Sequence, residues 1–250
     1  MPDPGGRPTV VLIPPSCCGA GYFRPLRRAL GDRVTARAVE LPGRGHRYDE
    51  PRVVHADSAV ADLDARIGAD VDVIYGESLG AYLGLAVLSS RDRGADGVVL
   101  VAASNSPPSA RSGDIPADLS TGERVVAALR TMGGEVPPEV LADTDDARDA
   151  VSLIRDDLHL SRSLATHLHG IRVAADIVVL AGRSDPTLYR PASWAVHTSG
   201  SCMVASLRGG HLLSAGNPAA VADAVAHVAS RRAVLCRPAA GGLRWKGTKP

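Results

Sequence analysis

The sequence predicts an α/β fold, in which a mostly parallel central sheet is flanked by helices and interrupted by a helical insertion. Three observations predict this fold. Short apolar runs rich in β-branched residues alternate with longer segments of helical character. This alternation stops after residue 104 and resumes at residue 176. The length of 250 residues suits one domain with a large core and room for an insertion.

Six apolar runs have the composition of buried strands, and in chain order they are residues 9–15, 34–41, 71–75, 97–104, 176–181 and 203–207. Helical segments separate them. Asp57 or Ser58 is the expected N-cap of one helix, and Asn217 followed by Pro218 marks the start of the last. Strands that alternate with helices imply parallel pairing through right-handed crossovers.

Residues 105–170 break the pattern because they contain no strand-like run. Ser120 and Glu123 form a capping box that predicts a helix, and further helical stretches are expected from Pro138 and over 147–169. A helical insertion between two sheet strands is typical of a lid over an active site. The alternative is a bulky crossover without a lid function.

The predicted domain organisation follows from these segments. Residues 1–104 and 171–232 form the α/β core, and residues 105–170 form the inserted lid. Residues 233–250 are rich in Gly and Pro and basic, so a flexible tail is expected.

Composition excludes several classes of function. The net charge of +1 provides no general attraction to nucleic acid or to a membrane surface. Four cysteines without a C-x-x-C motif form no disulfide framework, and neither a metal nor a cofactor is expected. The N-terminus has no apolar signal region, and no apolar run reaches membrane-spanning length, so a cytoplasmic protein is expected.

The stretch VDVIYGESLGAY, residues 71–82, contains the candidate nucleophile. It places a G-x-S-x-G motif, with Ser78 at its centre, between a strand and an apolar helical segment. That context is required by a nucleophile elbow, in which a sharp turn exposes the serine hydroxyl above the sheet. An ordinary strand–turn–helix junction is the alternative for this segment alone.

Two further residues have the positions that a serine nucleophile needs. In the α/β-hydrolase fold the acid follows the serine in the chain, and the histidine follows the acid. Asp185 comes directly after the strand DIVVLAG, and His211 follows the last strand on a loop with two glycines. The other seven histidines precede the serine, lie in the insertion, come before the last strand or fall in the last helix. The expected catalytic triad is therefore Ser78, Asp185 and His211.

The oxyanion hole of such a site needs two backbone N–H groups. One is expected from Leu79, directly after the nucleophile. The other is expected from the loop PPSCCGAG after the first strand, with Ser16 as the donor.

With these residues in place, the chain resembles the type II thioesterases that accompany polyketide synthases and nonribosomal peptide synthetases. The resemblance covers residues 9–230 and is most specific at LPGRGHR, residues 41–47. IPPSCCGAGYFRPL is similar to the oxyanion loop of the family, MGGEVPPEVL and LIRDDLHL to its lid helices, and AGRSDP and GGHLL to its acid and histidine segments.

The resemblance implies an α/β-hydrolase fold and hydrolysis of acyl groups from the phosphopantetheine arm of an acyl or peptidyl carrier protein. The role would be editing or product release, by a monomer without a cofactor. Two alternatives stay open: an esterase or acyl-CoA thioesterase acting on free small molecules, and a non-catalytic hydrolase fold that serves as an interaction module.

Three departures from the family pattern bear on the substrate. Glu77 stands where the family usually has histidine, Cys17 and Cys18 replace a Gly-Gly pair, and Leu212 replaces an aromatic residue. We therefore expect Cys17, Glu77 and Leu212 at the substrate pocket or lid. Several arginines are candidates for docking an acidic carrier protein, with Arg24 and Arg44 foremost, and a solvated charged face is the alternative; the others are Arg27, Arg28 and Arg47.

Overall fold

The computed structural model describes residues 6–91, 97–110 and 115–235. Its centre is a six-stranded sheet with the order β2-β1-β3-β4-β5-β6, and every pairing is parallel. The strands are β1 (Thr9–Ile13), β2 (Thr35–Ala38), β3 (Val73–Glu77), β4 (Val99–Ala103), β5 (Asp176–Gly182) and β6 (Cys202–Leu207). The predicted α/β fold with a parallel sheet is confirmed.

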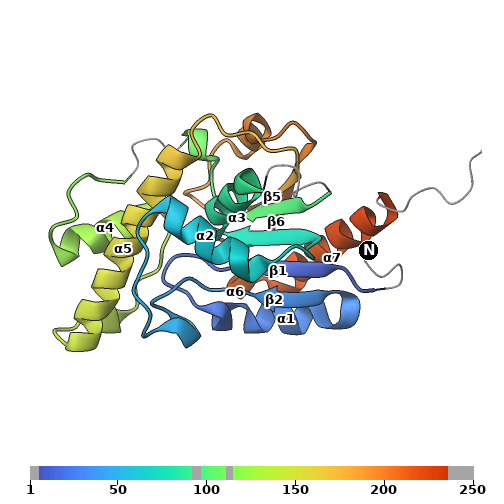
Figure 1. The fold of residues 1–250 in the computed structure, drawn as a ribbon. Helices are drawn as coiled ribbons and strands as arrows, with labels where there is room; N and C mark the ends of the chain where they lie inside the picture. The colour runs from blue at the N-terminus through green and yellow to red at the C-terminus, as the bar shows by residue number, and fades with distance from the viewer. Residues whose placement is uncertain (1–5, 92–96, 111–114, 236–250) are drawn as a thin grey trace, which may run out of the picture.

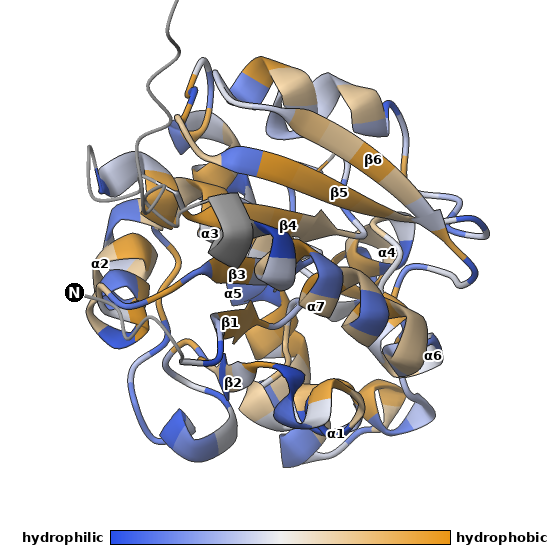
Figure 2. Cartoon of the chain, turned by 90° about the vertical axis from the view of Figure 1, so that its right-hand side faces the viewer, coloured by the Kyte–Doolittle hydropathy of each residue, from blue (hydrophilic) through white to orange (hydrophobic). Residues whose placement is uncertain are grey.

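The four central strands, β1, β3, β4 and β5, are buried on both faces, which explains why they are continuous apolar runs, whereas the edge strands β2 and β6 are partly exposed. Val10 and Leu12 face a cluster with α1 (Arg24–Leu30) and α7 (Pro218–Leu235). Val11 and Ile13 face the opposite cluster, with α2 (Ala56–Ile67) and α3 (Leu79–Ser90). Figure 2 shows the mostly hydrophobic central strands, with α7 on one side of the sheet and α2 and α3 on the other.

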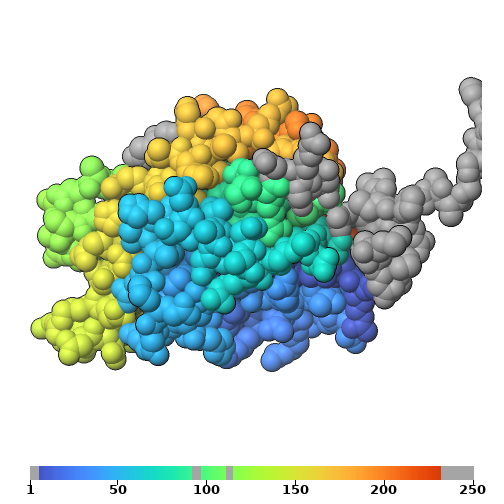
Figure 3. All heavy atoms as spheres, in the orientation of Figure 1, coloured from blue at the N-terminus to red at the C-terminus, as the bar shows by residue number. Residues whose placement is uncertain are grey.

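The segment between β4 and β5 contains α4 (Gly122–Thr131) and α5 (Asp145–His167) and, over its described residues 105–110 and 115–170, no strand. Part of α5 packs on the core through Leu160 and Leu164, while its first half packs with α4 in a separate apolar cluster. Figures 1 and 3 show these helices, coloured green to yellow, as a lobe at one end of the molecule. That this lobe is a lid stays a prediction.

Helix ends differ from the sequence-based expectation at several points. Helix α2 begins at Ala56 with His55 as its N-cap, so neither Asp57 nor Ser58 caps it. Helix α4 is capped by Thr121, whose hydroxyl accepts the N–H of Arg124, one residue later than expected. The stretch from Pro138 forms only a single turn of 3₁₀ helix. The C-terminal helix continues through Leu235, and the rest of the expected tail, residues 236–250, lies outside the described part of the chain.

Candidate active site

The three residues predicted to act together follow three different strands. Ser78 follows β3, Asp185 lies just after β5, and His211 lies just after β6. Since all strands are parallel, their carboxyl ends lie along one edge of the sheet, where ligand sites of open α/β sheets are found. Short α6 (Leu213–Gly216) follows His211 directly.

These three side chains form a hydrogen-bonded line. Nε2 of His211 lies 3.0 Å from Oγ of Ser78, and Nδ1 of His211 lies 3.0 Å from Oδ2 of Asp185. The side chain of Asp185 is fully buried and that of His211 is 8% exposed. The geometry allows the serine to pass its proton to the histidine while the buried carboxylate holds the ring in place.

The turn that carries Ser78 is strained. Ser78 has φ 54° and ψ −116°, a conformation that costs energy for a residue with a side chain. The residues two positions before and two positions after Ser78 must be glycines. A Cβ at Gly76 would lie 2.1 Å from the carbonyl oxygen of Gly80, and one at Gly80 would lie 2.2 Å from that of Ile13. The G-x-S-x-G pattern is thus required by close contacts between backbone segments.

Thr187, which the sequence analysis did not single out, determines how Asp185 faces the histidine. Its N–H and its hydroxyl both donate to Oδ1 of Asp185, at 2.9 and 2.7 Å, which leaves Oδ2 for His211. Burial alone would raise the pKa of Asp185, but the hydrogen bonds from His211 and Thr187 outweigh it and lower the pKa below its ordinary value. Asp185 is therefore ionised at neutral pH.

Asn105, two residues after the end of β4, is a second residue that the sequence analysis missed. Its side-chain amide donates to the carbonyl oxygen of Ser78 at 2.8 Å, and its own carbonyl accepts the indole N–H of Trp194 at 2.9 Å. This hydrogen bond from the end of the neighbouring strand stabilises the strained turn at Ser78. The sequence signal that could have identified Asn105 as a site residue is its position just after a central strand.

The two expected oxyanion donors both lie at this edge of the sheet. Leu79 is the first residue of α3, and the first N–H groups of a helix have no partner within it. Ser16 is partly exposed and lies on the loop after β1. Cys17, next to it, is partly buried against the apolar cluster of α4 and α5.

The insertion reaches the histidine through the turn after α4. Gly133 has φ 86°, and a Cβ at this position would lie 2.8 Å from Cγ of His211 and 2.9 Å from Oγ1 of Thr187. Backbone of the insertion therefore covers the imidazole directly. Leu212, the residue after the histidine, is half-buried and forms the N-cap of α6, and its place at the substrate pocket stays a prediction.

Glu77 lies beside the nucleophile in sequence but points into the fold. It is fully buried, and its carboxylate accepts the backbone N–H of Ser214 at 3.0 Å and the hydroxyl of Tyr75 at 3.3 Å. Its carboxylate binds the first turn of α6, the segment that follows His211. The expectation that Glu77 lines a substrate pocket is therefore wrong.

Replacing Glu77 with Gln is expected to change how stability depends on pH. Burial raises the pKa of Glu77 above its ordinary value, and the hydrogen bonds from Ser214 and Tyr75 oppose this only in part. The folded chain thus holds this proton more tightly than the unfolded chain, so the contribution of Glu77 to the free energy of unfolding falls as pH rises from about 4.5 through the folded-state pKa.

The Glu77→Gln variant lacks this loss, so its stability relative to wild type should increase between pH 4.5 and 8, as measured by denaturant unfolding. Glu50→Gln is the control: the hydrogen bond from Arg47 lowers the pKa of Glu50, so its effect on stability is confined to pH below about 4.5 and its difference from wild type should stay constant over this window. Parallel pH profiles for wild type and Glu77→Gln would contradict this account.

The prediction that these arginines form a docking surface is wrong for Arg44 and Arg47 and stays open for Arg24. Arg44 is 4% exposed and forms an ion pair with the buried Asp157 at 2.9 Å, so it does not belong to a docking surface. Arg47 is likewise buried, in ion pairs with Glu50 and Asp62. Arg24, on α1, is exposed and stays a candidate.

Neither vicinal cysteine is an activated thiol. Burial raises the pKa of Cys18 to about 11, and burial together with the charge of Asp157 raises that of Cys17. Within the described residues, no group of three or more His, Cys, Asp or Glu side chains is placed to hold a metal ion. None of the helices in that part of the chain is both long and apolar enough to cross a membrane.

Comparison with known proteins identifies a matching family and a related sequence. The model of the alpha/beta hydrolase family matches residues 10–224. Among curated proteins, the AMB antimetabolite synthetase AmbE of Pseudomonas aeruginosa is 27% identical over 213 residues, which cover 81% of this chain. The matched region is only 10% of that synthetase, so the chain corresponds to about a tenth of the relative's length.

Several solved structures share the fold. ClbQ of the colibactin NRPS/PKS pathway superposes with a TM-score of 0.74 at 18% identity, covering 92% of this chain and 100% of that one. The thioesterase RedJ of the prodiginine pathway in Streptomyces coelicolor has a TM-score of 0.71 at 23% identity, covering 91% and 92%. The type II thioesterase BorB of the borrelidin cluster has a TM-score of 0.71 at 24% identity, covering 90% and 94%.

Proposed function

Because the chain belongs to the alpha/beta hydrolase family, we propose that it is a serine hydrolase that cleaves acyl thioesters from the phosphopantetheine arm of carrier proteins. The observation that carries the proposal is the hydrogen-bonded line from Ser78 through His211 to the buried Asp185. Support for a thioester substrate comes from the likeness in fold to RedJ and BorB, both described as thioesterases. The role is editing or product release in a polyketide or nonribosomal peptide pathway.

Acylation uses the three side chains in sequence. His211 takes the proton of Ser78 through Nε2 while Oγ attacks the thioester carbonyl, and Asp185 keeps the ring oriented and stabilises the imidazolium. The N–H groups of Leu79 and Ser16 donate to the oxyanion of the tetrahedral intermediate. His211 then returns the proton to the departing pantetheine sulfur.

Deacylation repeats the same steps with water. The acyl group is held as an ester on Ser78, His211 removes a proton from water, and the resulting attack releases the carboxylic acid and restores the serine. Backbone at Gly133 packs on the imidazole, which favours exclusion of bulk water from the reacting atoms. We assign to α4 and the turn after it the role of a lid.

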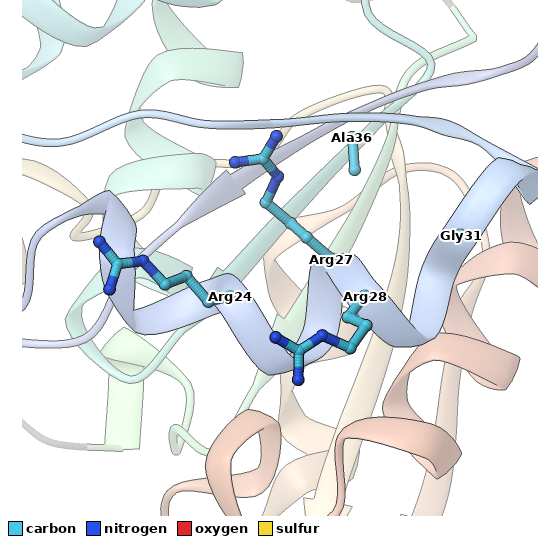
Figure 4. Close-up of a pocket in the computed structure, with 5 residues that line it drawn as sticks. All are labelled: Arg24, Arg27, Arg28, Gly31 and Ala36. Atoms are coloured by element: carbon cyan, nitrogen blue, oxygen red, sulfur yellow. The ribbon is translucent and has the colours of Figure 1, made fainter.

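Docking of the carrier is assigned to the arginines of α1. Arg24, Arg27 and Arg28 are exposed, and none has an ion-pair partner among the described residues. They line a surface depression of about 420 Å³ beside Ala36 of β2, and Figure 4 shows them along successive turns of the helix. Carrier proteins are acidic around the modified serine, so this surface has the complementary charge.

The proposal is tested by single-turnover hydrolysis of one acyl group from a carrier protein and from coenzyme A. Faster release from the carrier is expected. Combined replacement of Arg24, Arg27 and Arg28 by Ala should raise the KM for acyl-carrier about tenfold and leave acyl-CoA turnover within about twofold, because surface charges act mainly on encounter. Arg231→Ala is the matched control, an exposed arginine at the far end of α7.

Two results would contradict the proposal in different ways. Equal or faster release from coenzyme A would identify a thioesterase or esterase that acts on free small molecules. Failure of Ser78 to react with a fluorophosphonate, in protein that is fully folded, would identify a non-catalytic interaction module.

A further inference from the structure

A buried carboxylate of the insertion contacts the loop that holds the expected oxyanion donor. Asp157, in the middle of α5, is 1% exposed. Its Oδ2 accepts the backbone N–H of Cys17 at 2.6 Å and the guanidinium Nη1 of Arg44 at 2.9 Å. One oxygen atom thus joins three segments: the lobe helix, the loop after β1 and the loop after β2.

Burying this ion pair costs free energy, because both charged groups lose their contact with water. Both partners of the Arg44–Asp157 pair are almost fully buried, at 3% and 1% exposure of their side chains. Buried ion pairs are often replaceable by apolar side chains without loss of stability, so their presence favours a role in specifying one conformation. The backbone that this ion pair contacts is that of Cys17, so Cys17 is the residue whose conformation the pair would specify.

The loop makes a four-residue turn closed by a hydrogen bond from the N–H of Cys18 to the carbonyl of Pro15 at 3.3 Å. Cys17, the third residue of the turn, has φ 63°, whereas Ser16 has no positive φ. This combination defines a type II turn, which normally requires glycine at the third position. A side chain there costs about 1 kcal/mol or more.

Type I and type II turns differ mainly by a flip of their central peptide. Here the central peptide joins Ser16 to Cys17, and its N–H is the group that donates to Asp157. A type I turn would suit a cysteine better but would turn this N–H away from the carboxylate. A hydrogen bond to a carboxylate that also pairs with Arg44 favours the type II form.

We propose that Asp157 is a positioning residue, which holds the Pro15–Cys18 turn in its type II form and so sets the orientation of the oxyanion loop. The inference rests on the proposed function. Burial raises the pKa of Asp157, and the charge of Arg44 and the hydrogen bond from Cys17 oppose that rise. Through this contact α5 couples the placement of the insertion to the geometry of the reacting centre.

Two double variants isolate the contact without leaving an unpaired buried charge. Arg44→Met/Asp157→Asn keeps an oxygen acceptor for the N–H of Cys17, whereas Arg44→Met/Asp157→Leu removes it at similar volume. The Asn form should lose no more than about threefold in kcat. The Leu form should lose about 10- to 100-fold in kcat with little change in KM. Without its anchor at Cys17 the turn no longer holds the adjacent Ser16 in place, and an oxyanion donor acts in the transition state.

Glycine provides a rescue that a merely structural role would not show. Adding Cys17→Gly to the Arg44→Met/Asp157→Leu variant should recover about tenfold in kcat, since glycine adopts positive φ without cost. Asp149→Asn is the control on the same helix. Asp149 pairs with Arg52 and Tyr48 at the surface and joins α5 to the neighbouring loop without touching the turn.

Equal kcat for the Asn and Leu forms, at similar melting temperatures, would overturn the inference. A loss in the Leu form that glycine fails to restore would overturn the assignment to the turn. The rate of Ser78 labelling by a fluorophosphonate is measured on the same variants, because it depends on the oxyanion loop and not on a carrier. If no thioester is hydrolysed while labelling follows the expected order, the proposed function fails and this inference stands.

Discussion

Replacement of Ser78 by Ala is expected to lower kcat for thioester hydrolysis by about 10⁴-fold or more, because no other group in the proposed mechanism forms the acyl-enzyme. The fold should persist, since the residue's strained turn is determined by Gly76, Gly80 and the side chain of Asn105. Stopped-flow or single-turnover hydrolysis of an acyl-carrier measures the effect.

The control is Ser106→Ala, which alters a serine after the neighbouring strand. Its hydroxyl contacts the backbone of Thr187 and Tyr189 and does not touch the triad. Activity of Ser78→Ala within tenfold of wild type would refute the serine as nucleophile. Loss of acyl-enzyme from the mass spectrum should accompany the loss of rate.

Replacement of Asp185 by Asn is expected to lower kcat by about 10³- to 10⁴-fold, through the wrong histidine tautomer. Thr187 donates twice to Oδ1, so the amide oxygen of the new side chain will take that place. Its NH₂ group then faces Nδ1 of His211, which must be unprotonated to accept. The proton moves to Nε2, which can no longer accept the proton of Ser78.

Thr187→Val provides the matched comparison for this variant. It removes the hydroxyl and keeps the backbone N–H that binds Asp185, so a loss of less than about tenfold is expected. A loss for Asp185→Asn that is no larger than that for Thr187→Val would show that the carboxylate does not set the tautomer.

Much of the fold could be predicted because its signals are local. Asn217 with Pro218 opens the last helix as expected. Periodicity and turn residues act within a few positions, so they can be read without knowledge of the rest of the chain. Where two adjacent residues offered equivalent caps, as Ser120 and Thr121 do, local reasoning had no basis for a choice.

The members of the hydrogen-bonded line could be predicted for a related reason. Parallel strands bring their carboxyl ends to one edge, so the position of a residue just after a strand is enough to place Ser78, Asp185 and His211 near one another. Thr187 and Asn105 occupy similar positions but carry no motif. Their roles depend on which way each side chain points.

Periodicity and backbone sterics along the chain were enough to predict the parallel sheet, the elbow glycines and the order of serine, acid and histidine. Three features could be seen only in the folded chain: Glu77 points inward, Arg44 is buried, and Asp157 contacts Arg44 across 113 residues and Cys17 across 140. Such pairs form through space. Their partners are selected by packing and by the need to satisfy buried charge, and neither leaves a signal at any fixed spacing in the chain.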